Sequence, residues 1–204
     1  SYEKVVITVI ENENDLKSLI KRKPDLVFSG IKYFNFENQE IWLSDYLKKH
    51  KIDYITSNKE ALDNEYDKNH AKLIIKEANL NTAKFFTTQP DEHETENSLP
   101  VTFPLFLKPV NKNSPEDINA QSVVFDFKKY QAKVLDIYNT KKSRTLVENY
   151  LSGKEYSVSI VENKSKNILM ILPVEIVAVK NKNGHRILDY DARKDNLEEV
   201  IEVS

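Results

Sequence analysis

The sequence contains no cysteine, and this absence removes several kinds of site at once. Disulfide bridges, thiolate metal ligands and cysteine nucleophiles are all excluded. Glycine is almost as scarce, because Gly30, Gly153 and Gly184 are the only three in the chain. Loops that wrap phosphate groups through their backbone amides usually rely on several glycines. A mechanism that needs a glycine-rich phosphate loop is therefore disfavoured.

The sequence also lacks a strong excess of charge and a long apolar run. Its net charge is −2 at pH 7, with lysines and acidic residues interleaved, which argues against nucleic acid as a partner. No apolar run approaches the roughly 20 residues that cross a bilayer, and no signal-peptide pattern opens the sequence. These absences predict a soluble cytoplasmic protein without a membrane partner. Its 204 residues are enough for one large domain or two small ones.

The first part of the chain alternates between strand and helix patterns. Short β-branched or apolar runs predict strands at 4–10, 25–30 and 52–57. Apolar residues at helical spacing predict helices at about 13–22 and 39–50. Strands that alternate with helices favour a parallel sheet with crossover helices.

A further helix is predicted at 67–81, followed by an acidic segment between two prolines. Asp67 is suited to cap the start of this helix, and Asn79 stands near its end. Residues 89–100 predict a surface loop or linker. We expect its acidic and histidine side chains to be solvated rather than to bind a metal.

The second part of the chain has the pattern of an antiparallel α+β domain. Tyr156, Val158 and Ile160 alternate with serines, which is typical of a half-exposed antiparallel strand. The predicted fold class is therefore α/β plus α+β, with domains at 1–90 and 91–204. Strands are predicted at 103–109, 121–127, 144–151, 155–162 and 167–179, with a helix at 128–139.

Four charged residues stand where local patterning gives them no structural role. Lys108 closes an apolar strand, and Lys68 opens a helix, where a cation is unfavourable by a few tenths of a kcal/mol or more. Glu148 interrupts an apolar strand, and Glu155 follows the turn at Gly153. Each could be an ordinary solvated surface charge. Alternatively, Lys108 could meet an anionic ligand, because a buried amine is costly without an anionic partner.

The sequence segments around these residues resemble those of the ATP-grasp superfamily, and within it those of the D-alanine–D-alanine ligases. FPLFLKP (103–109) is similar to the family strand that ends in Lys-Pro, and LVENYLSGKEYSV (146–158) to its nucleotide-pocket segment. Asp67 and Lys68 match the family's Asp-Lys pair, with Lys72 at the second lysine position. The resemblance implies an abbreviated parallel-sheet domain followed by an ATP-grasp central subdomain with an antiparallel sheet.

The resemblance also implies a role for each residue in a cleft between two sheets, with the amines at one end and the acids at the other. Lys68 and Lys108 would contact the phosphates of ATP. Glu148, Asn149 and Leu151 would line the adenine, mainly through backbone groups, with Tyr150 adjacent to them. Glu155 would accept hydrogen bonds from the ribose. Ser114 stands at a serine position of the phosphate loop, and Arg193 is a candidate substrate or phosphate contact.

The implied reaction is ATP-dependent amide bond formation through an acyl phosphate. Its partners would be small carboxylate and amine substrates, as in peptidoglycan synthesis, and a homodimer is a further candidate. Mg²⁺ is an expected cofactor whose ligands would lie in a C-terminal segment beyond this sequence. No metal ligand is assigned here, and no catalytic residue.

Three departures from the family pattern leave the function open. Residues 110–117, VNKNSPED, contain no glycine; Lys194 stands where the family has a tyrosine; and the family's last segment does not follow Ser204. We expect an incomplete ligase that is inactive alone. A non-catalytic nucleotide-binding module is the alternative, and a ligase that joins another acid and amine is a third.

Overall fold

A computed structural model describes residues 3–37, 39–111, 118–163, 167–178 and 198–203. The chain divides into two compact units, Ser1–Asn64 and Glu65–Ser204, each considered by itself below. The division comes earlier than the predicted boundary near residue 90. The reason is that β5 (Phe85–Thr88) pairs with β8 (Thr145–Asn149), which places the residues just before 90 in the sheet of the second unit.

The first unit contains a small parallel sheet covered by two helices. β1 (Leu26–Phe28) and β4 (Asp53–Ile55) pair in parallel, which confirms the predicted parallel pairing. α1 (Glu13–Lys21) and α2 (Leu43–Lys49) bury their apolar faces in a common core. That core contains Leu16, Leu19, Phe34, Leu43, Leu47 and Ile52.

Two predictions for the first unit are wrong. The predicted helix at 39–50 begins only at Leu43, because residues 39–42 form β3 (Gln39–Trp42), which pairs with β2 (Tyr33–Phe36) in a hairpin. The predicted strand at 4–10 is not a strand in the structure: it pairs with none of the described strands, and Ile7 is 93% exposed. Without a neighbouring strand, its backbone groups have no sheet partner.

Helix α4 (Lys68–Glu77) follows α3 (Lys59–Tyr66), which the sequence analysis did not predict. Asp67 caps α4, because its side chain accepts a hydrogen bond of 2.9 Å from the backbone N–H of His70. Asn79 follows the helix with φ of 57°, the left-handed conformation that asparagine tolerates. Both end signals read from the sequence are therefore confirmed.

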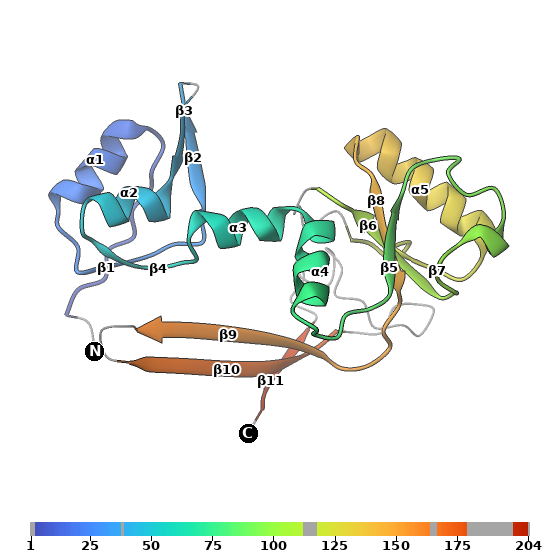
Figure 1. Ribbon diagram of the computed structural model, residues 1–204. Helices are drawn as coiled ribbons and strands as arrows, with labels where there is room; N and C mark the ends of the chain where they lie inside the picture. The colour runs from blue at the N-terminus through green and yellow to red at the C-terminus, as the bar shows by residue number, and fades with distance from the viewer. Residues whose placement is uncertain (1–2, 38, 112–117, 164–166, 179–197, 204) are drawn as a thin grey trace. The chain divides into compact units, whose positions relative to one another are not determined.

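The second unit is built on a four-stranded antiparallel sheet (Figure 1). Its strands follow the order β5-β8-β6-β7, with β6 at Leu105–Pro109 and β7 at Val123–Val124. Helix α5 (Phe127–Lys141) packs on one face through Tyr130, Val134 and Ile137. The inward residues of β6 and β8 on that face are Leu105, Leu107 and Val147, all fully buried.

The opposite face of the same sheet carries polar side chains. Side chains alternate between the faces of a strand, so Phe106 and Lys108 point away from the core formed with α5. In the antiparallel register, Phe106 is paired with Glu148 and Lys108 with Leu146. Helix α4 lies on this side of the sheet (Figure 1), in contact with Glu148. The two faces of the sheet thus differ: one packs against α5 in the core, and the other carries the charged side chains of Lys108 and Glu148.

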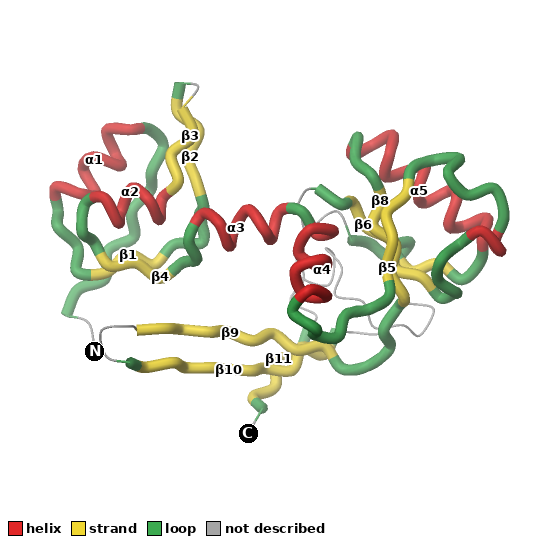
Figure 2. The backbone as a smooth tube through the Cα atoms, viewed as in Figure 1, coloured by secondary structure: helices red, strands yellow, loops and turns green. Residues whose placement is uncertain are grey.

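A second antiparallel sheet contains β9 (Glu155–Asn163), β10 (Ile168–Val177) and β11 (Glu199–Glu202), with β10 in the middle (Figure 2). The predicted antiparallel strand at 155–162 is confirmed by the pairing of β9 with β10. Its expected half-burial is wrong, because Ile160 is 65% exposed. Val161 and Met170 on the other face are exposed as well. Neither face of the β9–β10 hairpin forms a core with the described residues.

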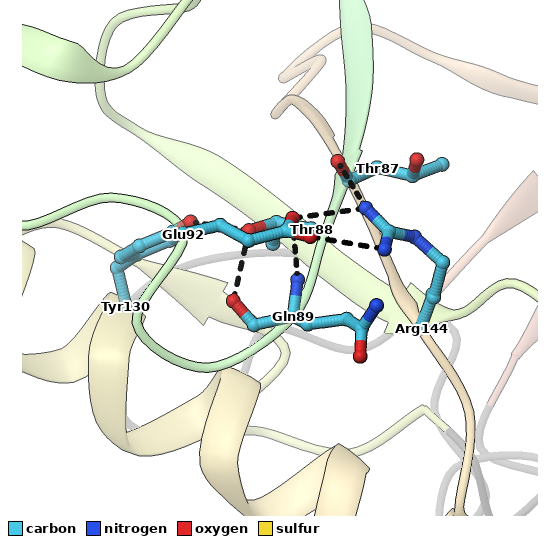
Figure 3. Close-up of polar contacts among 6 residues, drawn as sticks. All are labelled: Thr87, Thr88, Gln89, Glu92, Tyr130 and Arg144. Atoms are coloured by element: carbon cyan, nitrogen blue, oxygen red, sulfur yellow. Dashed lines mark hydrogen bonds and ion pairs between the residues drawn. The ribbon is translucent and has the colours of Figure 1, made fainter.

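The acidic segment at 89–100 forms a surface loop with one short 3₁₀ helix, Glu96–Ser98. Arg144 holds its start, because both terminal nitrogens of the guanidinium donate to the Glu92 carboxylate at 3.0 and 2.9 Å (Figure 3). The backbone N–H of Gln89 donates to the same carboxylate. These hydrogen bonds lower the pKa of Glu92 below its ordinary value, and those from Arg144 contribute most. The partial burial of Glu92 acts in the opposite direction.

Candidate functional site

A hollow of about 1030 Å³ lies within the second unit. Helix α4 contributes to one wall, β6 and β8 to another, and the segment from Tyr150 to Glu155 with the end of β10 to a third. A volume of this size is at the upper end of the range typical of small-molecule sites. The hollow therefore has room for a ligand the size of a nucleotide.

Seven of the predicted site residues line this hollow, although they are far apart in the sequence. Ser114 and Arg193, the other two, lie outside the described residues. The roles of all nine stay predictions. The seven lining residues are Lys68, Lys108, Glu148, Asn149, Tyr150, Leu151 and Glu155.

A carboxylate between two amines forms the most buried polar part of the hollow. One oxygen of Glu148, Oε1, lies 2.7 Å from Nζ of Lys108, and the other, Oε2, lies 2.7 Å from Nζ of Lys72. The side chains are 11% exposed for Glu148, 20% for Lys108 and 13% for Lys72. Burial by itself would raise the pKa of Glu148, but the two amines outweigh it, so the pKa is below the ordinary value. Glu148 is therefore ionised at neutral pH.

The arrangement corrects the expectation that amines and acids occupy opposite ends of the cleft. Glu148 is in direct contact with Lys108, because the β6–β8 register puts the two residues diagonally opposite on one face. The partner that meets the amine of Lys108 in this structure is thus a carboxylate of the protein itself. This pairing explains how an apolar strand can end in a largely buried lysine.

Lys72 is a site residue that the sequence analysis did not select. Its Nζ donates to Oγ1 of Thr82 at 2.7 Å in addition to its ion pair with Glu148, and it lies 5.0 Å from the ring centroid of Phe85. The sequence did contain a signal for Lys72, because it follows Lys68 by four residues. Residues four apart lie on the same face of a helix, so a lysine facing the hollow at 68 places another at 72.

The first turn of α4 is joined to the end of β6 by three contacts. The backbone N–H of Lys68 donates to the carbonyl of Val110 at 3.2 Å, and its Nζ donates to the carbonyl of Pro109 at 3.2 Å. Asp67 and Asn111 form an isolated antiparallel bridge. These contacts place Lys68 at the same edge of the hollow as Lys108, which precedes Pro109.

The end of β8 is only partly available for a ligand. The backbone N–H groups of Asn149 and Tyr150 donate to the carbonyls of Lys84 and Pro104 at 3.1 and 3.0 Å. The backbone N–H groups of these two residues are therefore already bonded within the protein.

The phenol of Tyr150 is perturbed by its surroundings. Burial raises the pKa of Tyr150, and the negative charge of Glu155 adds to the effect.

The described part of the chain contains no group of three histidine or acidic side chains placed to hold a metal ion. None of its helices combines the length and the apolar character that a bilayer crossing needs.

Comparison with known proteins gives consistent matches. The family model described as "D-ala D-ala ligase C-terminus" matches residues 74–203. D-alanine–D-alanine ligases of Aquifex aeolicus and Bacillus anthracis are each 25% identical to this chain, over 89% and 99% of it. A crystal structure of the Bacillus anthracis ligase complexed with ATP shares the fold, with a TM-score of 0.60 and 20% identity.

The match is partial in length. The chain spans 62% of each of these two curated ligases. In the structural comparison, the match covers 96% of this chain and 58% of the ATP-complexed ligase.

Proposed function

The chain belongs to the D-Ala-D-Ala ligase C-terminal family of the ATP-grasp type, and from this premise we propose that its second unit binds ATP in the hollow between α4, β6 and β8. Lys68 and Lys108 would contact the phosphates. Leu151 and the neighbouring residues would line the adenine, and Glu155 would contact the ribose. One observation carries the proposal: residues predicted from three segments far apart in the sequence line a single hollow.

The charges of the hollow support an anionic ligand. Its lining contains Lys68, Lys72, Lys108 and Lys154 against Glu148, Glu155 and Glu175, which leaves one net positive charge. Lys154 and Glu175 pair with each other at 2.7 Å. An amine near a unit negative charge is worth roughly 1 kcal/mol in water and about 4 kcal/mol at an effective dielectric of 20. The apolar side chains that share the lining, among them Ile75 and Ile176, suit a flat base. A nucleotide combines both requirements.

For the whole protein, we propose a carboxylate–amine ligase with amino acids as substrates. ATP would supply the phosphoryl group that activates a carboxylate, and an amine would displace the phosphate. The described residues do not fit a site for Mg²⁺, so no step is assigned to a metal here. A non-catalytic nucleotide-binding module is the second candidate. The glycine-free segment 110–117 favours it, because that segment has few backbone conformations with which to wrap phosphates.

Calorimetric titration with ATP, ADP and adenosine tests the proposal. We expect ATP to bind more tightly than adenosine, because only ATP meets the lysines. Lys108→Met should reduce ATP affinity by about tenfold, the effect of losing about 1.4 kcal/mol. It should leave adenosine affinity within about twofold of the wild type.

A matched control is Lys129→Met, which removes an exposed lysine on α5 that pairs with Asp126. This variant should bind ATP as the wild type does. Absence of ATP binding to the wild type at millimolar concentration would refute the proposed site. For the whole protein, ATP binding without phosphate release across a panel of amino acids would favour the non-catalytic candidate.

A further inference from the structure

The ion triad of Lys72, Glu148 and Lys108 contains two amines with different surroundings. Lys72 is surrounded by protein groups. Its Nζ lies 2.7 Å from Oε2 of Glu148, donates to Oγ1 of Thr82 at 2.7 Å, and lies 5.0 Å from the ring centroid of Phe85. An ammonium group has three donors. Two of those of Lys72 go to protein oxygens, and the ring occupies a further side. Lys72 therefore has little capacity left for a ligand.

Lys108 is less committed. Among the described residues its Nζ has one oxygen partner, Oε1 of Glu148 at 2.7 Å, and the ring of Phe106 at 5.4 Å. Its side chain is also more exposed than that of Lys72, at 20% against 13%. Lys108 thus has more N–H donors available for a ligand in the hollow than Lys72 has.

The charges of the triad explain why both amines are needed. Glu148 and Lys108 alone would form a pair with no net charge. Such a pair would not attract an anion electrostatically. With Lys72 present, the triad carries a net charge of +1. Lys72 therefore supplies the excess positive charge, although it is Lys108 that faces the ligand.

We infer that Lys72 is a positioning residue: it neutralises Glu148 from within the protein, so that Lys108 keeps its charge and its remaining donors for an anionic ligand. The inference rests on the proposed nucleotide site, whose phosphates are the anion concerned. In this division of roles Lys72 contacts no ligand. Its loss should nevertheless weaken binding through Lys108.

The experiment compares ATP affinity among variants that change the charge count of the triad. Lys72→Met leaves Glu148 with Lys108 alone, and we expect ATP affinity to fall about tenfold, the ratio for about 1.4 kcal/mol. Lys72→Arg keeps the positive charge and should bind within about threefold of the wild type. Lys129→Met serves as the control, because it removes a lysine from an exposed pair outside the hollow.

The double variant Lys72→Met with Glu148→Gln separates charge from structural damage. It removes one charge of each sign, so Lys108 again carries an unmatched positive charge. We expect it to bind ATP more tightly than Lys72→Met does, although it lacks more native contacts. A general loss of packing would instead make the double variant the weaker binder.

A second readout needs no nucleotide. In Lys72→Met, Glu148 keeps its burial but loses one of two counter-charges, so its pKa should rise relative to the wild type. Carbon-detected NMR titration of labelled glutamate carboxyl groups measures this change. As pH falls and Glu148 protonates, Lys108 is released and the variant should approach wild-type ATP affinity. The other charged or titratable groups lining the same hollow are Lys68, Tyr150, Lys154, Glu155 and Glu175.

The outcomes distinguish this inference from the function on which it rests. If wild-type protein does not bind ATP, the proposed function fails, and the inference fails with it. If the wild type binds ATP and Lys72→Met binds equally well, only the inference is overturned. A double variant as weak as Lys72→Met would also overturn it, because the effect would not then depend on charge.

Discussion

Replacing Glu148 by glutamine tests how far the triad stabilises the fold. The substitution keeps the size of the side chain and its place on β8. It removes the negative charge that lies 2.7 Å from both Lys72 and Lys108. Two largely buried amines would then face a neutral amide and each other. The fold must either tolerate this repulsion or release one of the lysines.

The expected cost follows from the burial of the three side chains. Removing one partner of a buried ion pair destabilises proteins by about 3–5 kcal/mol. Because Lys108 is 20% exposed and can recover some hydration, we take the lower end, about 3 kcal/mol. In a protein of this length each kcal/mol lowers Tm by about 2–4 °C, so the expected decrease is about 6–12 °C.

Thermal and urea unfolding followed by circular dichroism measure the effect. Glu94→Gln is the matched control, because it removes the same charge from an exposed position in the loop at 89–100. Its effect should stay within about 0.5 kcal/mol. A loss of less than about 1 kcal/mol for Glu148→Gln would refute the reasoning, because it would show that the triad is solvated rather than buried.

The difference between wild type and Glu148→Gln should also depend on pH. The pKa of Glu148 in the folded protein lies below its ordinary value of 4.5. Its ionised form therefore stabilises the fold fully above pH 4.5, and this contribution is lost as pH falls through the lower folded pKa. Unfolding free energies should differ most at neutral pH and converge in acid. A constant difference across this range would contradict the proposed ion triad.

Two further predictions concern the second unit. Leu107→Ala empties a fully buried position against α5 and should cost about 3–5 kcal/mol in urea unfolding; a loss under about 1 kcal/mol would show that the core is misassigned. Arg144→Met removes the contact that holds Glu92, but both side chains are 40% exposed, so the loss should be at most about 1 kcal/mol. Faster amide hydrogen exchange at Gln89 would report release of the loop, and unchanged exchange would contradict that role (Figure 3).

Helices with local end signals could be predicted from the sequence alone. Asp67 caps α4 as expected, and Asn79 ends it in the left-handed conformation. The cap is a contact between residues three apart, so it depends on neighbouring residue types and not on the rest of the fold. The parallel pairing of β1 with β4 was predictable for a related reason, because a chain that alternates strands with helices favours a parallel sheet.

Strands whose existence depends on a distant partner could not be predicted in the same way. β5 has no signal beyond a short aromatic run, and it becomes a strand because it pairs with β8. Residues 4–10 have a stronger strand pattern but pair with none of the described strands. Residues 39–42 continue a helical stripe, yet they pair with β2 in a hairpin. Backbone pairing across the fold overrides local preference at these positions.

For the candidate site, the sequence alone indicated which charged residues are candidates. Lys68, Lys108, Glu148 and Glu155 stood out because their charges conflict with the local pattern. Only the tertiary structure decided how they combine. The β6–β8 register brings Lys108 to Glu148, and the docking of α4 adds Lys72. The physical reason is that the energy of a buried charge depends on its distance to other charges, and that distance is set by contacts between segments remote in the chain.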